Sequence, residues 1–287
     1  MFILCYSLPL KDIDNVIEKL QINDIYDVFY ESPLEITTDE NGYGYIEKED
    51  EPTTLKVAYD GEFETLKEFN NKIQPLIGTK CFNIYEENES YDNFNIPAID
   101  IDENWVLASP DDEVSEGKRK INFISQGAFG TGLHETTQDL LRIILEKDFS
   151  NKSVLDIGTG SGILSIAAAI KNASLVTAVD IRDVKDEVML NASLNNLDNI
   201  NVLVGDILTK EIEITDKFDW IFINIGGVET EMFIDFIKKH LKKDGMILVS
   251  GLVEWSFDKV KTHIENNNFK LIKKHQTNEW CTAIFSY

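Results

Sequence analysis

The hydrophobic pattern of the chain changes at about Ile121. Beyond this residue, short apolar runs alternate with segments whose apolar residues recur every three or four positions. The runs predict parallel strands covered on both faces, and the segments, such as 162–171 and 229–242, predict amphipathic helices. We therefore expect an α/β domain with a doubly wound, mostly parallel, seven-stranded sheet. Its predicted strands are 153–156, 175–180, 201–204, 220–224, 246–251, 269–273 and 281–286, the last two forming an antiparallel hairpin.

The first 88 residues show a different order of elements. Four strand-like runs and two helical segments follow one another as β-α-β-β-α-β, which predicts a small α+β ferredoxin-like domain. An acidic stretch, 39–52, is expected to be a long hairpin loop. Residues 89–120 are mostly polar and acidic and contain Pro97, so we interpret them as a linker to a second domain at 121–287, with a short strand at 105–108. The strand-like runs are 2–8, 25–30, 54–59 and 80–86, and the helical segments are 12–21 and 63–76.

Acidic residues dominate the charge of the chain. Its 51 Asp and Glu outnumber its 27 Lys and Arg, for a formal net charge of −24. Residues 1–100 alone contain 22 acidic and 7 basic side chains. This balance argues against direct nucleic-acid binding and favours a basic protein partner. The alternative is that the charge only keeps the surface soluble.

The cysteines and apolar runs indicate the compartment. Cys5, Cys81 and Cys281 are too few and too widely spaced for a disulfide framework or a metal site. The apolar start of the chain is too short for a signal peptide, and no run approaches the roughly 20 residues of a membrane span. We therefore expect a cytoplasmic, monomeric protein that binds no metal, and we see no dimer-forming element in the sequence.

A glycine-rich turn follows the first predicted strand of the second domain. The segment Val154-Leu-Asp-Ile-Gly-Thr-Gly-Ser-Gly162 places Gly158 and Gly160 between a strand and a helix. Glycines allow a ligand to approach the backbone closely, and ligands of such sheets bind beyond the carboxyl ends of the strands. Asp156, two residues before Gly158, suits a cationic amino group better than a pyrophosphate. The alternative is a plain strand–helix turn.

Three further polar residues close predicted strands. Asp180 is placed to accept hydrogen bonds from the ribose hydroxyls of a nucleoside, or else to cap a helix. Asp206 is a candidate for the adenine amino group, or else a turn residue. Asn224 ends an apolar run, where its amide can hold an attacking amine. Its alternative is a turn residue before Gly226 and Gly227.

A second glycine-rich segment precedes the first helix of this domain. In Gly127-Ala-Phe-Gly-Thr-Gly-Leu-His-Glu-Thr-Thr137, glycines flank Thr131, and Thr137 lies in the first helical turn. The pattern is typical of a loop folded over a bound ligand, rather than of a capped helix start alone. His134 by itself is interpreted as a structural or surface residue.

Together these motifs resemble the class I S-adenosylmethionine-dependent methyltransferases, whose fold is Rossmann-like. More narrowly, they resemble the PrmA family, which methylates a bacterial large-subunit ribosomal protein. The resemblance rests on the segments 128–137 and 154–164, on Asp180 and the Asn224 strand, and on Ser250-Gly-Leu252 and Glu279-Trp280. It covers roughly residues 127–287.

The resemblance implies S-adenosyl-L-methionine as the cofactor. By position, Thr137, Gly158, Asp180 and Asn224 would contact it, and Asn224 would also border the substrate amine. Asp156 and Gly160 would shape the methionine pocket. In the family, a small N-terminal domain recognises the ribosomal substrate, which assigns that role to residues 1–88.

The sequence therefore predicts a protein N-methyltransferase that acts on lysine or N-terminal amines of a large-subunit ribosomal protein. Asn224 is the predicted catalytic residue. One alternative is the same chemistry on a different protein or a small amine, which the unusual Ile225-Gly-Gly227 favours. Another is a cofactor-binding module without catalysis.

Overall fold

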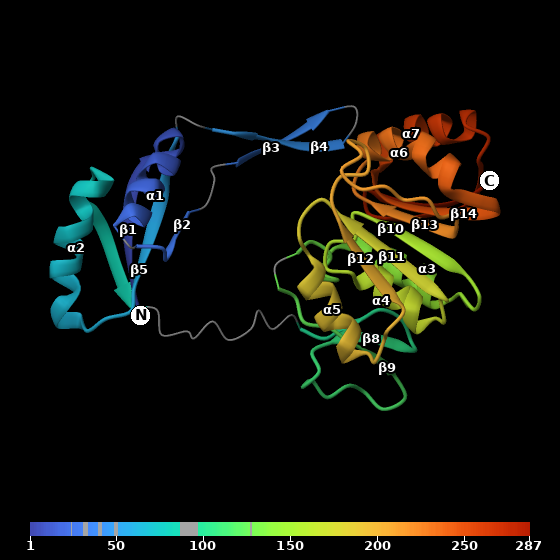
Figure 1. Cartoon of the computed structure of the whole chain (residues 1–287), viewed down its shortest axis with the longest axis horizontal. Helices are drawn as coiled ribbons and strands as arrows, with labels where there is room; N and C mark the ends of the chain where they lie inside the picture. Colours follow the sequence, from blue (N-terminus) through green and yellow to red (C-terminus); the bar gives the residue numbers. More distant parts are fainter. Residues whose placement is uncertain (24, 31–33, 40–41, 49–50, 87–96, 127) are drawn as a thin grey trace. The chain divides into compact units, whose positions relative to one another are not determined.

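Two compact units make up the chain, residues 1–39 with 43–92 and residues 40–42 with 93–287. The computed structural model describes residues 1–23, 25–30, 34–39, 42–48, 51–86, 97–126 and 128–287 (Figure 1).

The first unit contains a four-stranded antiparallel sheet in the order β2-β5-β1-β6. With one helix after β1 and one after β5, this is the ferredoxin-like arrangement that the sequence predicts. Side chains of β1, β5 and both helices share one hydrophobic core. The elements are β1 (Phe2–Pro9), a 3-10 turn (Leu10–Asp12), α1 (Ile13–Ile22), β2 (Val28–Tyr30), β5 (Pro52–Tyr59), α2 (Phe63–Ile77) and β6 (Cys81–Glu86).

The chain segment that connects β2 to β5 forms a second, two-stranded sheet. Strands β3 (Leu34–Asp39) and β4 (Gly42–Glu47) pair there. The predicted loop at 39–52 is therefore largely strand, and its hairpin begins earlier than expected. Leu34 and Ile36 alternate with Glu35 and Thr37 in β3, and the β-favouring residues Tyr and Ile recur in β4. Residues 40–41 and 49–50 of the predicted loop lie outside the described part of the chain.

The second unit is built on a seven-stranded sheet in the order β12-β11-β10-β13-β14-β16-β15. Neighbouring strands from β12 to β14 are parallel, whereas β16 runs antiparallel to both β14 and β15. All seven predicted strands occur, including the final hairpin. They are β10 (Ser153–Ile157), β11 (Leu175–Asp180), β12 (Ile200–Val204), β13 (Phe218–Asn224), β14 (Leu241–Val253), β15 (Lys270–Thr277) and β16 (Trp280–Ser286).

Helices cover both faces of this sheet (Figure 1). Successive strand residues point to opposite faces, so Val154 packs toward α3, α4 and α5, and Leu155 packs toward α6 and α7. This two-sided burial explains the nearly continuous apolar runs in the sequence. The helices are α3 (Glu135–Leu145), α4 (Ile163–Ile170), α5 (Lys185–Leu194), α6 (Gly227–His240) and α7 (Glu254–Asn266).

The second half of the predicted linker, 89–120, contains regular structure. Strands β7 (Ile99–Asp100), β8 (Trp105–Ala108) and β9 (Arg119–Asn122) form a three-stranded sheet there. Trp105 and Leu107 are buried in the core of the second unit. The apolar run 105–108 predicts β8 correctly, whereas β7 and β9 contain few apolar residues and were not predicted. Residues 89–96 of the predicted linker lie outside the described residues.

Within the described residues, no helix combines the length and the apolar character needed to cross a membrane.

Candidate active site

A cavity of about 580 Å³ lies at the carboxyl ends of the central parallel strands. From β10 the chain proceeds to β11 and β12 on one side, and then returns to β13 on the other side. Such a reversal opens a crevice where ligands bind in doubly wound sheets. Five predicted site residues line this cavity, namely Gly158, Gly160, Asp180, Asp206 and Asn224.

The glycine turn after β10 brings the backbone to the cavity wall. Gly158 and Gly160 adopt φ values of 68° and 53°, which favour glycine. A Cβ atom on residue 160 would overlap the carbonyl oxygen of Phe129, and one on residue 158 would lie 2.7 Å from the Ile225 side chain. Glycine at both positions therefore permits the neighbouring segments to close around the turn.

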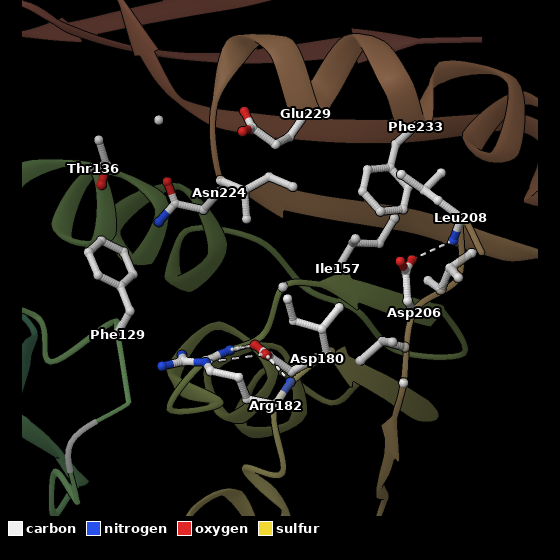
Figure 2. A pocket seen from close by; sticks show the side chains of 18 of the residues that line it. Phe129, Thr136, Ile157, Asp180, Arg182, Asp206, Leu208, Asn224, Glu229 and Phe233 are labelled. Carbon is white, nitrogen blue, oxygen red and sulfur yellow. Dashed lines mark hydrogen bonds and ion pairs between the residues drawn. The ribbon is translucent and has the colours of Figure 1, made fainter. Parts of the chain in front are cut away.

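Asp180 is fixed at the cavity edge by backbone groups. Its Oδ2 accepts a hydrogen bond of 2.9 Å from the Gly160 N–H, and its Oδ1 accepts one of 3.0 Å from the Arg182 N–H. The Arg182 Nε also lies 3.7 Å from Oδ1. Figure 2 shows this carboxylate pointing toward the cavity with Arg182 beside it. The position at the end of β11 is the one the sequence assigns to ribose recognition.

Asp156 is buried beneath the turn and does not line the cavity. Its Oδ2 accepts hydrogen bonds of 2.7 Å from both the Thr159 and the Ser165 hydroxyls. Burial raises the pKa of Asp156, whereas these hydroxyl groups favour its ionised form. These hydrogen bonds join Asp156 to Thr159 and Ser165 and so support the shape of the glycine turn. The contact of Asp156 with a cationic amino group stays a prediction.

Asp206 is a turn residue that also lines the cavity, and its contact with adenine stays a prediction. Its Oδ1 accepts a hydrogen bond of 2.7 Å from the Leu208 N–H, which is the role of a turn residue. The residue also lines the cavity, together with Ile207 and Leu208 (Figure 2). These apolar neighbours form a surface suited to a flat ring, with a carboxylate at its edge.

The glycine-rich loop before α3 is tied to the turn after β10. The Ser161 N–H donates to the Phe129 carbonyl, and the Ser161 hydroxyl donates to the Gly130 carbonyl, both at 2.9 Å. Phe129 consequently lines the cavity, whereas Thr131 does not. Gly127, the first residue of this motif, lies outside the described residues.

In the first turn of α3, Thr136 rather than Thr137 lines the cavity. Consecutive helical residues point about 100° apart, so the two threonines cannot share one direction. Thr137 is only 1% exposed, and its hydroxyl has no hydrogen-bond partner among the described residues. Thr136 is thus the threonine that lines the cavity, and the cofactor contact assigned to Thr137 stays a prediction.

His134, interpreted from the sequence as a structural or surface residue, has a structural role and also lines the cavity. Its imidazole Nδ1 lies 2.9 Å from the Thr136 hydroxyl and accepts a hydrogen bond from the Thr136 N–H, so it caps α3. Trp280 packs edge-on against it, with ring centroids 4.8 Å apart. Because Trp280 comes from β16, a distant strand, this neighbour of His134 was not visible from local sequence.

The other end of the cavity is formed by β13 and α6. Asn224 ends β13, and Glu229 and Phe233 extend from the first two turns of α6. Neither α6 residue was predicted. Residues four positions apart lie on the same face of a helix. This spacing is the sequence feature from which both residues could have been predicted.

Helix α5 holds the segment that leads into the loop. The Asn191 Oδ1 accepts a hydrogen bond of 2.8 Å from the Ile124 N–H, and the Asn191 Nδ2 donates one of 2.9 Å to the Ile124 carbonyl. One turn earlier, the Glu187 carboxylate accepts from the Gln126 and Ala128 N–H groups. These hydrogen bonds from α5 hold the backbone that leads to Phe129.

Comparison with known proteins identifies the family. The sequence model of PrmA, described as ribosomal protein L11 methyltransferase, matches residues 65–286. The chain belongs to the PrmA family. The resemblance seen in the sequence motifs is thereby confirmed.

Two relatives illustrate the similarity to other PrmA members. The chain is 40% identical over 161 residues to a ribosomal protein L11 methyltransferase of Fusobacterium nucleatum, covering 55% of this chain and 51% of that protein. It is 31% identical over 246 residues to one of Lactobacillus acidophilus, covering 83% and 76%. The first match thus spans about half the length of that relative.

A solved structure agrees with the fold. The crystal structure of ribosomal protein L11 methylase from Lactobacillus delbrueckii subsp. bulgaricus aligns with a TM-score of 0.58 at 28% identity. The alignment covers 66% of this chain and 97% of that one. The predicted class I methyltransferase fold is confirmed.

Proposed function

We propose that this PrmA-family chain transfers methyl groups from S-adenosylmethionine to amine nitrogens of ribosomal protein L11, at lysine or the N-terminus. The observation that supports this most strongly is the cavity at the sheet reversal, with Asp180 at one side and Asn224 at the other. Family membership points to the same chemistry.

The residues present fit S-adenosylmethionine. A volume of about 580 Å³ is within the roughly 300–1,000 Å³ typical of small-molecule sites. Asp180 offers carboxylate oxygens where a ribose would lie, and Ile207 and Phe233 offer apolar surface to an adenine. Gly158 and Gly160 have no side chains, so the backbone itself forms this part of the cavity wall. A Cβ at either position would overlap Ile225 or Phe129.

The bound cofactor supplies an activated methyl group on a sulfonium, so the chain needs chiefly to align the acceptor. The amine lone pair would form the new bond to the methyl carbon, and the sulfur would keep the electron pair of the carbon–sulfur bond that breaks. Asn224 is placed to hold the amine by a hydrogen bond to its amide oxygen. Orientation of this kind accounts for large rate effects.

The acceptor must lose a proton before attack. A lysine with an ordinary pKa of about 10.4 is mostly protonated at neutral pH, and water is the simplest proton acceptor. We assign no general base, because the reaction needs only a small unprotonated fraction held in place. The aromatic residues Phe129, His134 and Trp280 help to exclude water from the cavity.

The first unit is proposed as the reader of the protein substrate. Its acidic side chains complement a basic ribosomal protein. We propose that residues 1–88 bind L11 and that the enzyme works as a cytoplasmic monomer, without direct contact to nucleic acid.

The test is methyl transfer from labelled S-adenosylmethionine to ribosomal subunits and extract of cells lacking this gene. The proposal predicts label in L11. Label in another protein or a small amine would assign a different acceptor, for which the Ile225-Gly-Gly227 segment leaves room. Cofactor binding without any transfer would indicate a module that does not catalyse.

A further inference from the structure

Three carboxylates line the cavity, and two of them are already engaged. Asp180 accepts two backbone hydrogen bonds and lies beside Arg182. Asp206 accepts a hydrogen bond from Leu208. Within the described part of the chain, no hydrogen bond or ion pair joins the third, Glu229, to another group.

Glu229 lies at the acceptor end of the cavity. It extends from the first turn of α6, and a Cβ on Gly226 would overlap its Oε2. The carboxylate thus lies over the backbone that follows Asn224. Figure 2 shows Glu229 and Asn224 at one end of the cavity and Asp206 at the other.

Helix capping is the ordinary role for a Glu at this position. In a capping box, the third helical residue accepts a hydrogen bond from the N–H of the capping residue, here Gly226. That bond is not formed between Glu229 and Gly226 in this structure. The carboxylate is exposed and remains available to a cation that enters the cavity.

We propose that Glu229 is a positioning residue that draws the protonated acceptor amine into the cavity beside Asn224. This inference rests on the proposed function. An ammonium group is attracted by the carboxylate on approach, and after losing its proton to water the neutral amine is held by Asn224. Glu229 is not assigned as the base, because water takes the proton in the proposed reaction.

The test compares Glu229→Gln with the wild-type enzyme in steady-state methylation of purified L11. We expect KM for L11 to rise about two- to fivefold with kcat nearly unchanged, the scale of one exposed ion pair. Added salt should raise KM of the wild type more than that of the variant. Glu229→Asp should recover part of the loss. Asp235→Asn, on an exposed part of the same helix, is the matched control and should behave as the wild type.

Three results separate the possibilities. An unchanged KM in Glu229→Gln, with an active wild type, overturns the role of Glu229. Weaker binding of S-adenosylmethionine to this variant, measured by calorimetry, also overturns it and assigns Glu229 to the cofactor. An inactive wild type on L11 instead contradicts the proposed function itself.

Discussion

At the scale of single residues, Asp180 illustrates how the fold prepares a ligand site. Its carboxylate is held by backbone N–H groups of two segments, Gly160 and Arg182, so its orientation does not depend on a flexible partner. A fixed acceptor costs little ordering when a ligand binds. The ribose role of Asp180 therefore makes a direct prediction.

Asp180→Ala should weaken S-adenosylmethionine binding by about 1–3 kcal/mol, the scale of hydrogen bonds to a charged group. Isothermal titration calorimetry measures this change. Asp186→Ala, at an exposed position early in α5, serves as the control and should bind normally. An unchanged affinity in Asp180→Ala would remove the carboxylate from the cofactor site.

Asn224→Ala should lower kcat for L11 about tenfold or more, because the amine loses its orienting hydrogen bond. Single-turnover kinetics with bound cofactor isolates this step from product release. Full activity of the variant would exclude Asn224 from the acceptor site.

At the scale of elements, the sequence predicts strands and turns better than it predicts side-chain directions. All seven strands of the large sheet follow from apolar runs, but β14 is longer than 246–251 because Leu241 already pairs with Phe218 of β13. Asp156 and Thr137 were assigned to the cofactor site from motif position, yet neither lines the cavity. Glu229 and Trp280 were absent from the predicted site, because tertiary packing alone brings α6 and β16 to it.

The contact between the glycine turn and the loop before α3 can be tested at Gly160. Gly160→Ala should destabilise the enzyme and reduce cofactor binding, because its Cβ would overlap the Phe129 carbonyl in addition to the cost of a positive φ. Gly117→Ala shares the positive φ but has open space around its Cβ, and is the matched control. Thermal unfolding should show a larger loss for Gly160→Ala, and equal losses would argue against the contact.

At the scale of the whole molecule, the two units have separate hydrophobic cores. The cavity and every residue discussed for it belong to the second unit. The sequence anticipated a division between a small α+β domain and an α/β domain, although it extended the linker too far, into β7, β8 and β9.

Deletion of residues 1–88 should leave cofactor binding within about twofold of the full chain and abolish methylation of L11, because the acidic reader is removed. Calorimetry with S-adenosylmethionine and transfer assays with L11 measure the two effects. Normal methylation by the shortened chain would show that recognition lies in the second unit.

The central claim is that the cavity beyond β10, β11 and β13 binds S-adenosylmethionine. Calorimetric titration of the purified full-length chain with this cofactor, and with its demethylated product S-adenosylhomocysteine, tests it most directly. We predict saturable binding of each at one site per chain, weakened in Asp180→Ala. Absence of binding for both ligands would contradict the account.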